Sequence, residues 1–372
     1  MPDHTGLRQG LSELPWHRIA VLLAALVSTA WLLALPAPPS PAPPVFPAAQ
    51  PTVPPLPRWS GPDPVRVPGV LADGSQYQPR LFLPTGASVG LADGDLVLVT
   101  PGEDPTVLRG GTAAQTHFDG FVTSGDMLVW AESVSRPDAP VSTMLWRTNW
   151  RTGTQPRQVA TDTGEVSFRG GQHDIVVHDG RAYWAAVGAG DEPTTEVRSV
   201  ALTGSRVSVR TVAGEYALAA WPWLVGVGGG RGTAIPLLNL DTGERISVAT
   251  DAREVTTCGP AWCRVGVLGD NALIGLEVRR PDGTQRRRVA GPEATAAIVD
   301  VALVDRFVPL IVDRGDATRP GTALGLYDIA ADRVELVAEE AADVQGRDGV
   351  LWWSVGSGAA LAWYALDLRT VP

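Results

Sequence analysis

The sequence has little of what catalytic, metal and nucleic-acid sites require. It contains 2 cysteines and 5 histidines among 372 residues, and all 30 of its Lys and Arg positions are arginine. The formal net charge of −10 leaves no positive surface for phosphates or anionic lipid head groups, which argues against nucleic acid as a partner. Two cysteines without neighbouring histidines also make a poor zinc site, so we predict no metal and no cofactor.

Long helices are excluded over most of the chain. The sequence has 41 glycines and 32 prolines, which interrupt it too often for extended helical segments. Hydrophobic residues make up 44% of the composition, which is ample for a core. An all-β fold built as one large repeat domain fits both the length and the composition.

One long apolar run breaks this pattern near the N-terminus. Residues 19–35, IAVLLAALVSTAWLLAL, carry no charge, although they are at the short end of the ~17 to 25 residues needed to cross a bilayer. The run could be a cleaved signal sequence, but Pro36, Pro38 and Pro39 follow it where a signal peptidase needs small residues. We therefore predict an uncleaved transmembrane helix.

The arginines around this run predict its orientation. Arg8 and Arg18 precede it, and the next arginine is Arg58. By the positive-inside rule, residues 1–18 form a cytoplasmic tail and the rest of the chain is extracytoplasmic. Residues 36–60 are predicted to form a proline-rich stalk, which in polyproline II conformation at ~3.1 Å per residue spans roughly 70 Å. Residues 61–372 are the predicted folded domain.

The clearest repeat lies between Asp179 and Val212. An apolar run (183–187), a polar loop, and two alternating runs (196–202 and 206–212) joined at Thr203-Gly204 predict three antiparallel strands. A further apolar run, 216–220, is expected to supply the fourth. Sheets of about four strands that recur every 40 to 50 residues are typical of β-propeller blades.

Further hairpins share this pattern of apolar strand, tight turn and second strand. Their turns lie at Thr152-Gly153, Asp241-Thr242-Gly243, Asp282-Gly283 and Ala331-Asp332. Gly and Asp accept the positive φ that such turns demand.

Apolar runs between the hairpins are predicted to be the innermost strands. They are residues 95–100, 127–131, 182–187, 223–227, 262–267, 307–312 and 350–355. These runs predict seven blades. The segment from Gly94 to Gly125 is short, so six full blades and one degenerate blade remain an alternative. The last blade is incomplete, and residues 79–83 and 87–91 are expected to complete it, which would leave no open sheet edge.

The hairpins and their spacing resemble TolB-like and WD40-like β-propeller repeats, in the membrane-anchored form seen in actinobacterial cell-envelope proteins. The resemblance covers roughly residues 75–372. The Gly-His and Trp-Asp dipeptides of WD40 blades are absent. The resemblance implies a six- or seven-bladed β-propeller that binds proteins or glycans, and it implies no reaction.

Cys258 and Cys263 are predicted to form a disulfide. The four residues between them, GPAW, are expected to form a turn from the fourth strand of one blade to the inner strand of the next, with the two sulfurs facing each other. An oxidising location favours the bond. The spacing differs from the Cys-x-x-Cys of redox sites.

Several tryptophans are predicted to pack between blades. They are Trp130, Trp184, Trp223, Trp262, Trp352 and Trp353. The adjacent pair Trp352 and Trp353 must point to opposite faces of its strand, so we expect at least one to leave the core and offer a possible ligand-binding face. Asp93, Asp95 and two further acidic residues, Asp179 and Asp348, are expected to rim one mouth of the ring.

The remaining motifs predict no chemistry. The GxSxG pattern at residues 86–90 lacks the helix that a nucleophile elbow needs, and the glycine-rich run 226–232 lacks a phosphate-binding spacing. His173 and His178 have an odd offset on an extended strand and are predicted to be surface or turn residues that cannot share a metal. We therefore identify no catalytic residue.

These observations favour a non-catalytic module that binds or scaffolds an envelope protein, peptide or glycan. The alternative is an extracytoplasmic propeller enzyme, a hydrolase, lyase or cyclase, with a carboxylate or metal site in its central channel. A cluster of Asp, Glu or His converging at one mouth would favour the enzyme. The sequence leaves the ligand, the binding face and the oligomeric state open.

Overall fold

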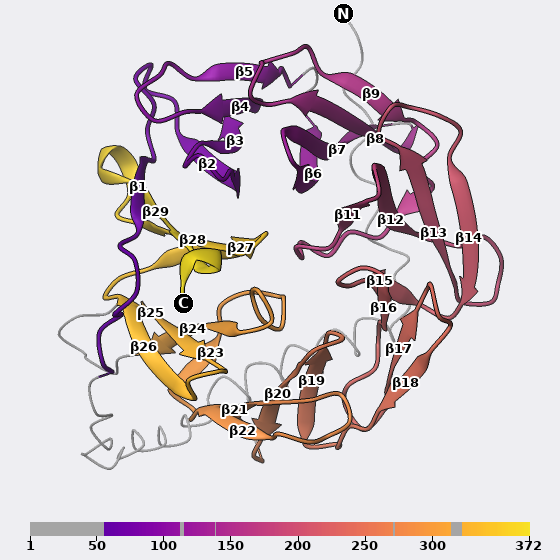
Figure 1. Ribbon diagram of the computed structural model, residues 1–372, viewed down its shortest axis with the longest axis vertical. Helices are drawn as coiled ribbons and strands as arrows, with labels where there is room; N and C mark the ends of the chain where they lie inside the picture. The colour runs from indigo at the N-terminus through magenta and orange to yellow at the C-terminus, as the bar shows by residue number, and fades with distance from the viewer. Residues whose placement is uncertain (1–55, 112–114, 138, 271, 314–321) are drawn as a thin grey trace, which may run out of the picture. The chain divides into compact units, whose positions relative to one another are not determined.

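A computed structural model describes residues 56–111, 115–137, 139–270, 272–313 and 322–372. The described residues form seven antiparallel sheets arranged as the blades of a closed ring (Figure 1). The all-β prediction and the prediction of seven blades are therefore confirmed. The predicted cytoplasmic tail, the transmembrane helix and the stalk up to residue 55 lie outside the described residues. No helix within the described ranges is long and apolar enough to span a membrane.

Each blade contains strands at four positions from the centre of the ring outwards. The innermost strands are β2 (Tyr77–Phe82), β6 (Thr116–Ser124), β11 (Ile175–His178), β15 (Tyr216–Leu218), β19 (Glu254–Cys258), β23 (Ala294–Ala296) and β27 (Ala342–Arg347). The second strands are β3 (Ser88–Ala92), β7 (Met127–Arg136), β12 (Arg181–Val187), β16 (Trp223–Gly226), β20 (Cys263–Leu268), β24 (Phe307–Asp313) and β28 (Val350–Val355).

In six of the seven blades, the third and the outermost strand are consecutive in the chain and form a hairpin. In the seventh blade, the outermost strand is β1. The third strands are β4 (Asp95–Val99), β8 (Ala139–Asn149), β13 (Thr194–Ala201), β17 (Ile235–Asn239), β21 (Leu273–Arg279), β25 (Thr322–Asp328) and β29 (Ala362–Asp367). The outermost strands are β5 (Thr106–Arg109), β9 (Arg157–Ala160), β14 (Ser208–Ala213), β18 (Arg245–Val248), β22 (Arg287–Ala290), β26 (Arg333–Ala338) and β1 (Val65–Pro68). The third blade has an extra short strand, β10 (Glu165–Val166), beside β12.

All five predicted hairpins are present, and each joins a third strand to an outermost strand. The predicted position of the apolar runs within each blade was wrong, however. Six of the seven predicted innermost strands are second strands, and residues 95–99 form a third strand. The true innermost strands have three to nine residues and are mixed in polarity, because they border the central channel. The run from Tyr216 likewise begins the next blade instead of ending its own.

The prediction for ring closure named the wrong segments. Residues 79–83 and 87–91 lie in β2 and β3, which build a regular first blade, so the degenerate blade is also ruled out. The last blade is completed by β1, which pairs antiparallel with β29 from Val65↔Ala365 to Pro68↔Ala362. The N-terminal part of the domain thus closes the ring, as the incomplete last blade required.

The segment before β1 also packs on the ring. Arg58 forms a parallel bridge with Leu336 on β26, and the Trp59 amide donates to the Leu336 carbonyl at 2.9 Å. The amide of Leu336 in turn donates to the carbonyl of Pro57 at 2.7 Å. The chain therefore contacts the sixth blade first, then completes the seventh, and then begins the first.

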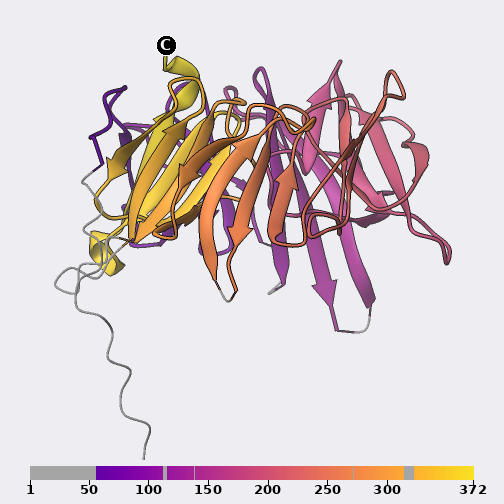
Figure 2. The same ribbon diagram turned by 90° about the horizontal axis from the view of Figure 1, so that it is seen from below.

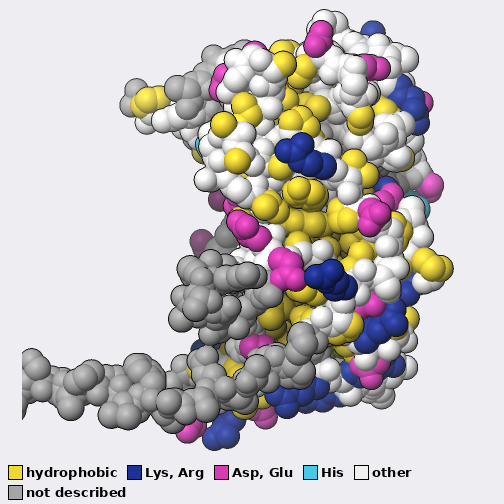
Figure 3. All heavy atoms as spheres, turned by 90° about the vertical axis from the view of Figure 1, so that its left-hand side faces the viewer, with side chains coloured by type: hydrophobic (Ala, Val, Ile, Leu, Met, Phe, Trp, Pro, Cys, Tyr) yellow, Lys and Arg dark blue, Asp and Glu magenta, His cyan; other side chains and the backbone are white. Residues whose placement is uncertain are grey.

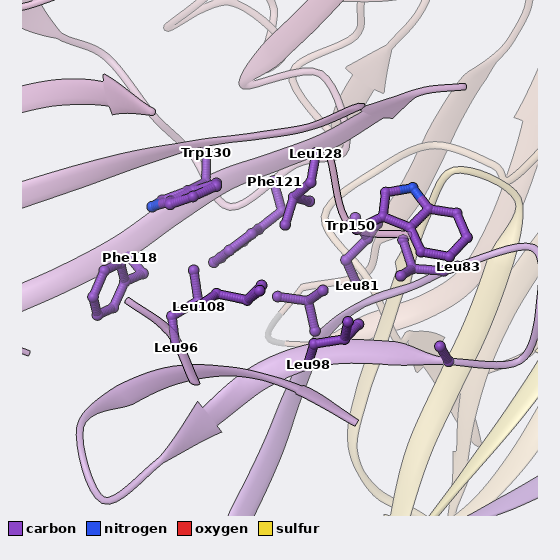
Figure 4. Packing of buried hydrophobic residues seen from close by; sticks show 12 residues of the cluster. Leu81, Leu83, Leu96, Leu98, Leu108, Phe118, Phe121, Leu128, Trp130 and Trp150 are labelled. Atoms are coloured by element: carbon purple, nitrogen blue, oxygen red, sulfur yellow. The ribbon is translucent and has the colours of Figure 1, made fainter. Parts of the chain in front are cut away.

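Side chains from adjacent blades interlock between the sheets. In Figure 4, Trp130 and Phe121 of the second blade face Leu81, Leu96 and Leu98 of the first. Because each sheet is covered on both faces, a β-strand here can bury two consecutive residues. The predicted packing of tryptophans between blades is confirmed for Trp130 and Trp184, which are fully buried.

Two of the turns that join an innermost strand to a second strand are formed by Asp-Gly pairs. Asp179-Gly180 joins β11 to β12, and Asp348-Gly349 joins β27 to β28. All four residues have positive φ, between 46° and 75°, which Gly adopts freely and Asp tolerates. Figure 2 shows the C-terminus on one face of the ring and the β7–β8 hairpin projecting from the other.

The outer edge of the ring near β1 carries both signs of charge. Figure 3 shows hydrophobic side chains exposed in the middle of this side, bordered by Arg and by Asp or Glu side chains. On the atoms drawn in colour in that view, no broad positive surface is visible, in keeping with the net charge of −10.

Val67 is the side chain of β1 that enters the core, where it packs with Trp363 and Tyr77. We expect Val67→Ala to lower the free energy of unfolding of the full chain by about 2 kcal/mol, because it removes two buried methyl groups. Val65→Ala, on the same strand but exposed, should change it by less than about 0.5 kcal/mol. Guanidinium denaturation followed by tryptophan fluorescence compares them, and equal effects would contradict a closure strand anchored by Val67.

Cys258 and Cys263 lie opposite each other in the β19–β20 hairpin and are joined as a disulfide. Their turn joins the first and second strands of one blade, not two successive blades as predicted. Replacing both cysteines by serine should cost about 2 kcal/mol of stability, since so short a loop loses little entropy on closure. Reducing the wild-type protein should reproduce this loss in a denaturation curve, and unchanged stability in both cases would refute it.

Candidate functional site

Two loops enter the centre of the ring from opposite sides. One covers residues 167–174, between β10 and β11 of the third blade, and the other covers residues 297–306, between β23 and β24 of the sixth. Figure 1 shows both loops reaching inward past the innermost strands. They bring polar and charged side chains to the channel that the strands alone would not supply.

The two loops are hydrogen-bonded to each other. The backbone amide of Gln172 donates to both carboxylate oxygens of Asp300, at 3.3 and 3.1 Å. The side-chain amide of Gln172 donates to the carbonyl of Ala302 at 3.4 Å. The third and sixth blades are thus connected through the middle of the ring, and the loops divide the channel into two cavities.

Arg264 on β20 holds the second loop in place. Its Nη1 donates to the carbonyls of Ile298 at 2.9 Å and Asp300 at 2.6 Å, and its Nη2 donates to the carbonyl of Val299 at 3.3 Å. Burial lowers the pKa of Arg264 to about 10, and the negative charge of Asp300 opposes this shift. The guanidinium therefore stays protonated at neutral pH and supports the loop through its backbone.

Asp174 holds the backbone of the first loop, as Arg264 holds that of the second. Its two carboxylate oxygens accept the backbone amides of Arg169 and Gly170, both at 2.8 Å. Burial raises the pKa of Asp174, while these two hydrogen bonds and the charge of Arg347 oppose the shift. Both loop carboxylates, Asp174 and Asp300, thus accept backbone amides of residues 169–172.

His173, next to Asp174 in the first loop, lines the same cavity as Asp174 and Asp300. Burial lowers its pKa, the charge of Asp300 opposes the shift, Arg347 adds to it, and Asp305 also opposes it. The imidazole is therefore largely neutral at pH 7. His178, in contrast, is half-exposed beside Asp179 and stacks near Trp221, with ring centroids 5.7 Å apart. The two histidines lie apart, as predicted. The prediction of surface or turn residues is confirmed in its second form for His173, which lies in a turn with a partly buried side chain.

The larger cavity has a volume of about 610 Å³ and opens on the face that carries the turns of the innermost strands. The two loops form its floor, and β15, the β19–β20 turn with its disulfide, and the C-terminal segment form its walls. Asp348 and Arg369 lie at its edge, 3.7 Å apart. We call it the outer cavity.

The lining of the outer cavity mixes apolar and charged side chains. Its apolar residues include Trp262, Val299, Val301 and Val304, and Val299 is 55% exposed. Thr257 carries the one hydroxyl among the lining side chains, and the sulfur of Cys258 is committed to the disulfide. Within the described ranges no group of three or more His, Cys, Asp or Glu side chains is arranged to hold a metal ion.

A smaller cavity of about 270 Å³ lies on the other side of the two loops. Strands β2, β6 and β27 line it, and Asp174 and Asp300 border both cavities. We call it the inner cavity. The loops therefore act as a partition between the two spaces.

The predicted ligand-face aromatics do not line the outer cavity. Trp352 is 1% exposed and packs toward the first blade against Phe82, whereas Trp353 is 2% exposed and packs toward the sixth blade. They do point to opposite faces, but the expectation that one leaves the core was wrong. Both faces of the seventh sheet are covered by neighbouring blades, which a single strand sequence does not reveal.

The predicted acidic rim is also split between the two faces. Asp179 and Asp348 lie in turns on the face of the outer cavity, whereas Asp93 and Asp95 lie at the β3–β4 turn on the opposite face. Ser88 of the GxSxG pattern is buried in β3 and accepts a hydrogen bond from Tyr77 at 2.9 Å.

Sequence reasoning missed four central charged residues, Asp174, Arg264, Asp300 and Arg347, and it assigned no chemistry to His173. Their one sequence signal was the unusual length of two segments, 161–174 and 297–306, which carry few strand-forming patterns. Nothing in the sequence indicated that the two would meet.

Comparisons with known proteins support the fold. No protein-family model matches the chain, and no curated protein sequence matches it. A Mycobacterium tuberculosis puromycin-hydrolyzing peptidase is similar in structure, with a TM-score of 0.51 and 13% identity over 85% of this chain and 55% of that chain. The β-propeller domain of the Trilobed protease from Pyrococcus furiosus gives a TM-score of 0.46 and 10% identity, covering 68% of this chain and 83% of that chain.

TolB from Acinetobacter baumannii is a third similar structure, with a TM-score of 0.34 and 12% identity over 66% of this chain and 60% of that chain. The chain spans about half the length of the mycobacterial peptidase. At 13% identity the likeness to the mycobacterial peptidase shows the β-propeller fold alone.

The lowered pKa of His173 predicts a pH dependence of stability. The unfolded chain, titrating near 6.5, takes up this proton before the folded protein does, so stability falls as the pH drops through that value. We expect wild type to lose more stability than His173→Gln between pH 7.5 and 5.5, by at most about 1.4 kcal/mol per pH unit. Denaturation at both pH values tests this.

His178→Gln is the matched control, since that imidazole is half-exposed in the next turn. It should keep the wild-type pH dependence. If both variants behave like wild type, burial of His173 does not contribute to the acid sensitivity.

Proposed function

We propose that this protein is a membrane-anchored, extracytoplasmic β-propeller that binds a protein or peptide segment in its outer cavity without catalysing a reaction. Residues 19–35 would anchor it, with residues 1–18 in the cytoplasm. The predicted stalk, residues 36–60, would be shorter at its end, since Pro57, Arg58 and Trp59 pack on the sixth blade. The observation that carries the proposal is the outer cavity of about 610 Å³, a concave space with an apolar wall and a charged edge. A disulfide at this cavity supports an oxidising location.

Exposed apolar side chains inside the cavity favour a binding role. Val299 and Val304 are large hydrophobic residues that remain exposed, although they belong to a loop held firmly by Arg264. Apolar side chains gathered in a concavity and bordered by polar groups are typical of recognition sites. Trp262 adds a rigid aromatic wall, with the Arg280 guanidinium 3.8 Å above its ring.

The edge of the cavity carries both charges. Asp348 accepts a hydrogen bond from Thr123 at 3.2 Å and lies near Arg369, so a hydroxyl of the second blade meets a charged pair of the seventh there. Such a rim selects partners by charge pattern more than it adds affinity. A peptide segment, with apolar and charged side chains in alternation, matches this lining better than a uniformly polar glycan does.

An enzyme is the second candidate, because His173, Asp174 and Asp300 converge at the floor of the outer cavity. A general acid or base needs a carboxylate free to meet substrate. Asp174 and Asp300 instead accept backbone amides that hold the loops together, at 2.8 to 3.3 Å. Because these hydrogen bonds occupy both carboxylates, they favour the binding role. Turnover of any substrate by the purified protein would favour the enzyme.

Cross-linking of the full-length protein in its native membrane, followed by capture, tests the binding role. We expect an envelope protein to be recovered with wild type and reduced about tenfold or more by Val299→Glu, which places a charge on the apolar wall. Val209→Glu is the control, because Val209 is similarly exposed, at 47%, on the outermost strand β14. Equal recovery with both variants would place the partner outside the cavity and contradict the proposal.

A further inference from the structure

Two buried hydrogen-bond donors among the residues that line the inner cavity lack an acceptor. The cavity is also lined by Arg347 on β27, which is 9% exposed and donates from Nη1 to the Phe121 carbonyl at 2.9 Å. Arg80 on β2 donates from Nη2 to Gln78 Oε1 at 3.1 Å, and its buried Nε has no acceptor. The buried indole N–H of Trp352, a third lining residue, has none either.

Such an arrangement is unusual for a structural core. Buried polar groups are nearly always hydrogen-bonded, and a donor left without an acceptor destabilises the fold. Arg80 and Arg347 also bring two like charges to one small space, and each lacks an ion pair with a carboxylate among the described residues. The two unpaired donors and the two guanidiniums together suit an acceptor that carries negative charge.

The aspartates that line this cavity do not fill that role. Asp174 and Asp300 accept backbone amides of the first loop, as described above. Burial lowers the pKa of Arg80 and of Arg347. The charge of Asp119, an exposed residue on β6, opposes this shift at Arg80, whereas at Arg347 the charges of Asp174 and Asp300 oppose it first and that of Asp119 after them. Asp119 is thus near both guanidiniums but forms no hydrogen bond with either.

We propose that the inner cavity binds the oxyanion of a small ligand, a carboxylate or a phosphate, between Arg80 and Arg347. A guanidinium presents paired N–H donors that match the oxygens of these groups. The volume of about 270 Å³ suits a small organic acid or a phosphate with several waters, each of which occupies about 30 Å³. Arg80 and Arg347 do not line the outer cavity, although Val299 borders both spaces, and the site does not depend on the proposed partner there.

Titration calorimetry of the full-length protein with inorganic phosphate, and separately with acetate, at constant ionic strength tests the site. Wild type should bind at least one of the two anions. Binding of phosphate alone identifies a phosphate-bearing ligand, and binding of acetate identifies a carboxylate. Arg80→Gln should weaken binding about tenfold or more, because a charged donor is lost.

Asp119→Asn supplies a gain-of-affinity test that misfolding cannot imitate. Removing this competing negative charge should tighten anion binding by about three- to tenfold. Arg66→Gln, an exposed arginine on β1 with the same change of charge, should bind as wild type does. The proposal is overturned if neither wild type nor Asp119→Asn binds either anion, or if Arg66→Gln weakens binding as much as Arg80→Gln.

Discussion

The pairing of β1 with β29 is the constraint on which this ring depends. Both faces of every sheet are covered by the neighbouring blades. An open ring would therefore expose one apolar sheet face on each side of the gap. The four residue pairs from Val65↔Ala365 to Pro68↔Ala362 supply the missing outer strand. The indole N–H of Trp363, which donates to the Tyr77 carbonyl at 2.7 Å, then ties the seventh blade to the first. Closure thus joins the two ends of the domain by backbone and by side chain.

Closure also explains the character of the channel. Seven short inner strands leave a space that their own side chains do not fill, and the loops from the third and sixth blades occupy its middle. These loops are held by charged side chains bonded to backbone groups, as with Arg264 and Asp174, and less by apolar packing. A central partition built in this way stays polar, and it borders two cavities of different chemistry. The outer one has an apolar wall, whereas the inner one has excess donors.

This difference between the cavities follows from which strands line them. The outer cavity is bounded by turns and loops, where Val299 and Val304 are not covered by a neighbouring blade. The inner cavity is bounded by mid-strand residues of β2, β6 and β27, whose side chains alternate between the core and the channel. Arg80 thus points to the channel because the next residue of β2, Leu81, belongs to the core. Arg347, the last residue of β27, lines the same cavity.

The sequence by itself determined the features that depend on near neighbours along the chain. The hairpins with Gly or Asp turns, the all-β class, the repeat that predicts seven blades, and the facing of Cys258 and Cys263 all require contacts within a few residues. Tertiary structure alone decided which strand is innermost, which segment completes the last blade, and that both Trp352 and Trp353 are buried. It also brought Gln172 to Asp300 and Arg347 to Phe121. These outcomes depend on residues more than a hundred positions apart, whose encounter is set by ring closure and leaves no periodic pattern in the sequence.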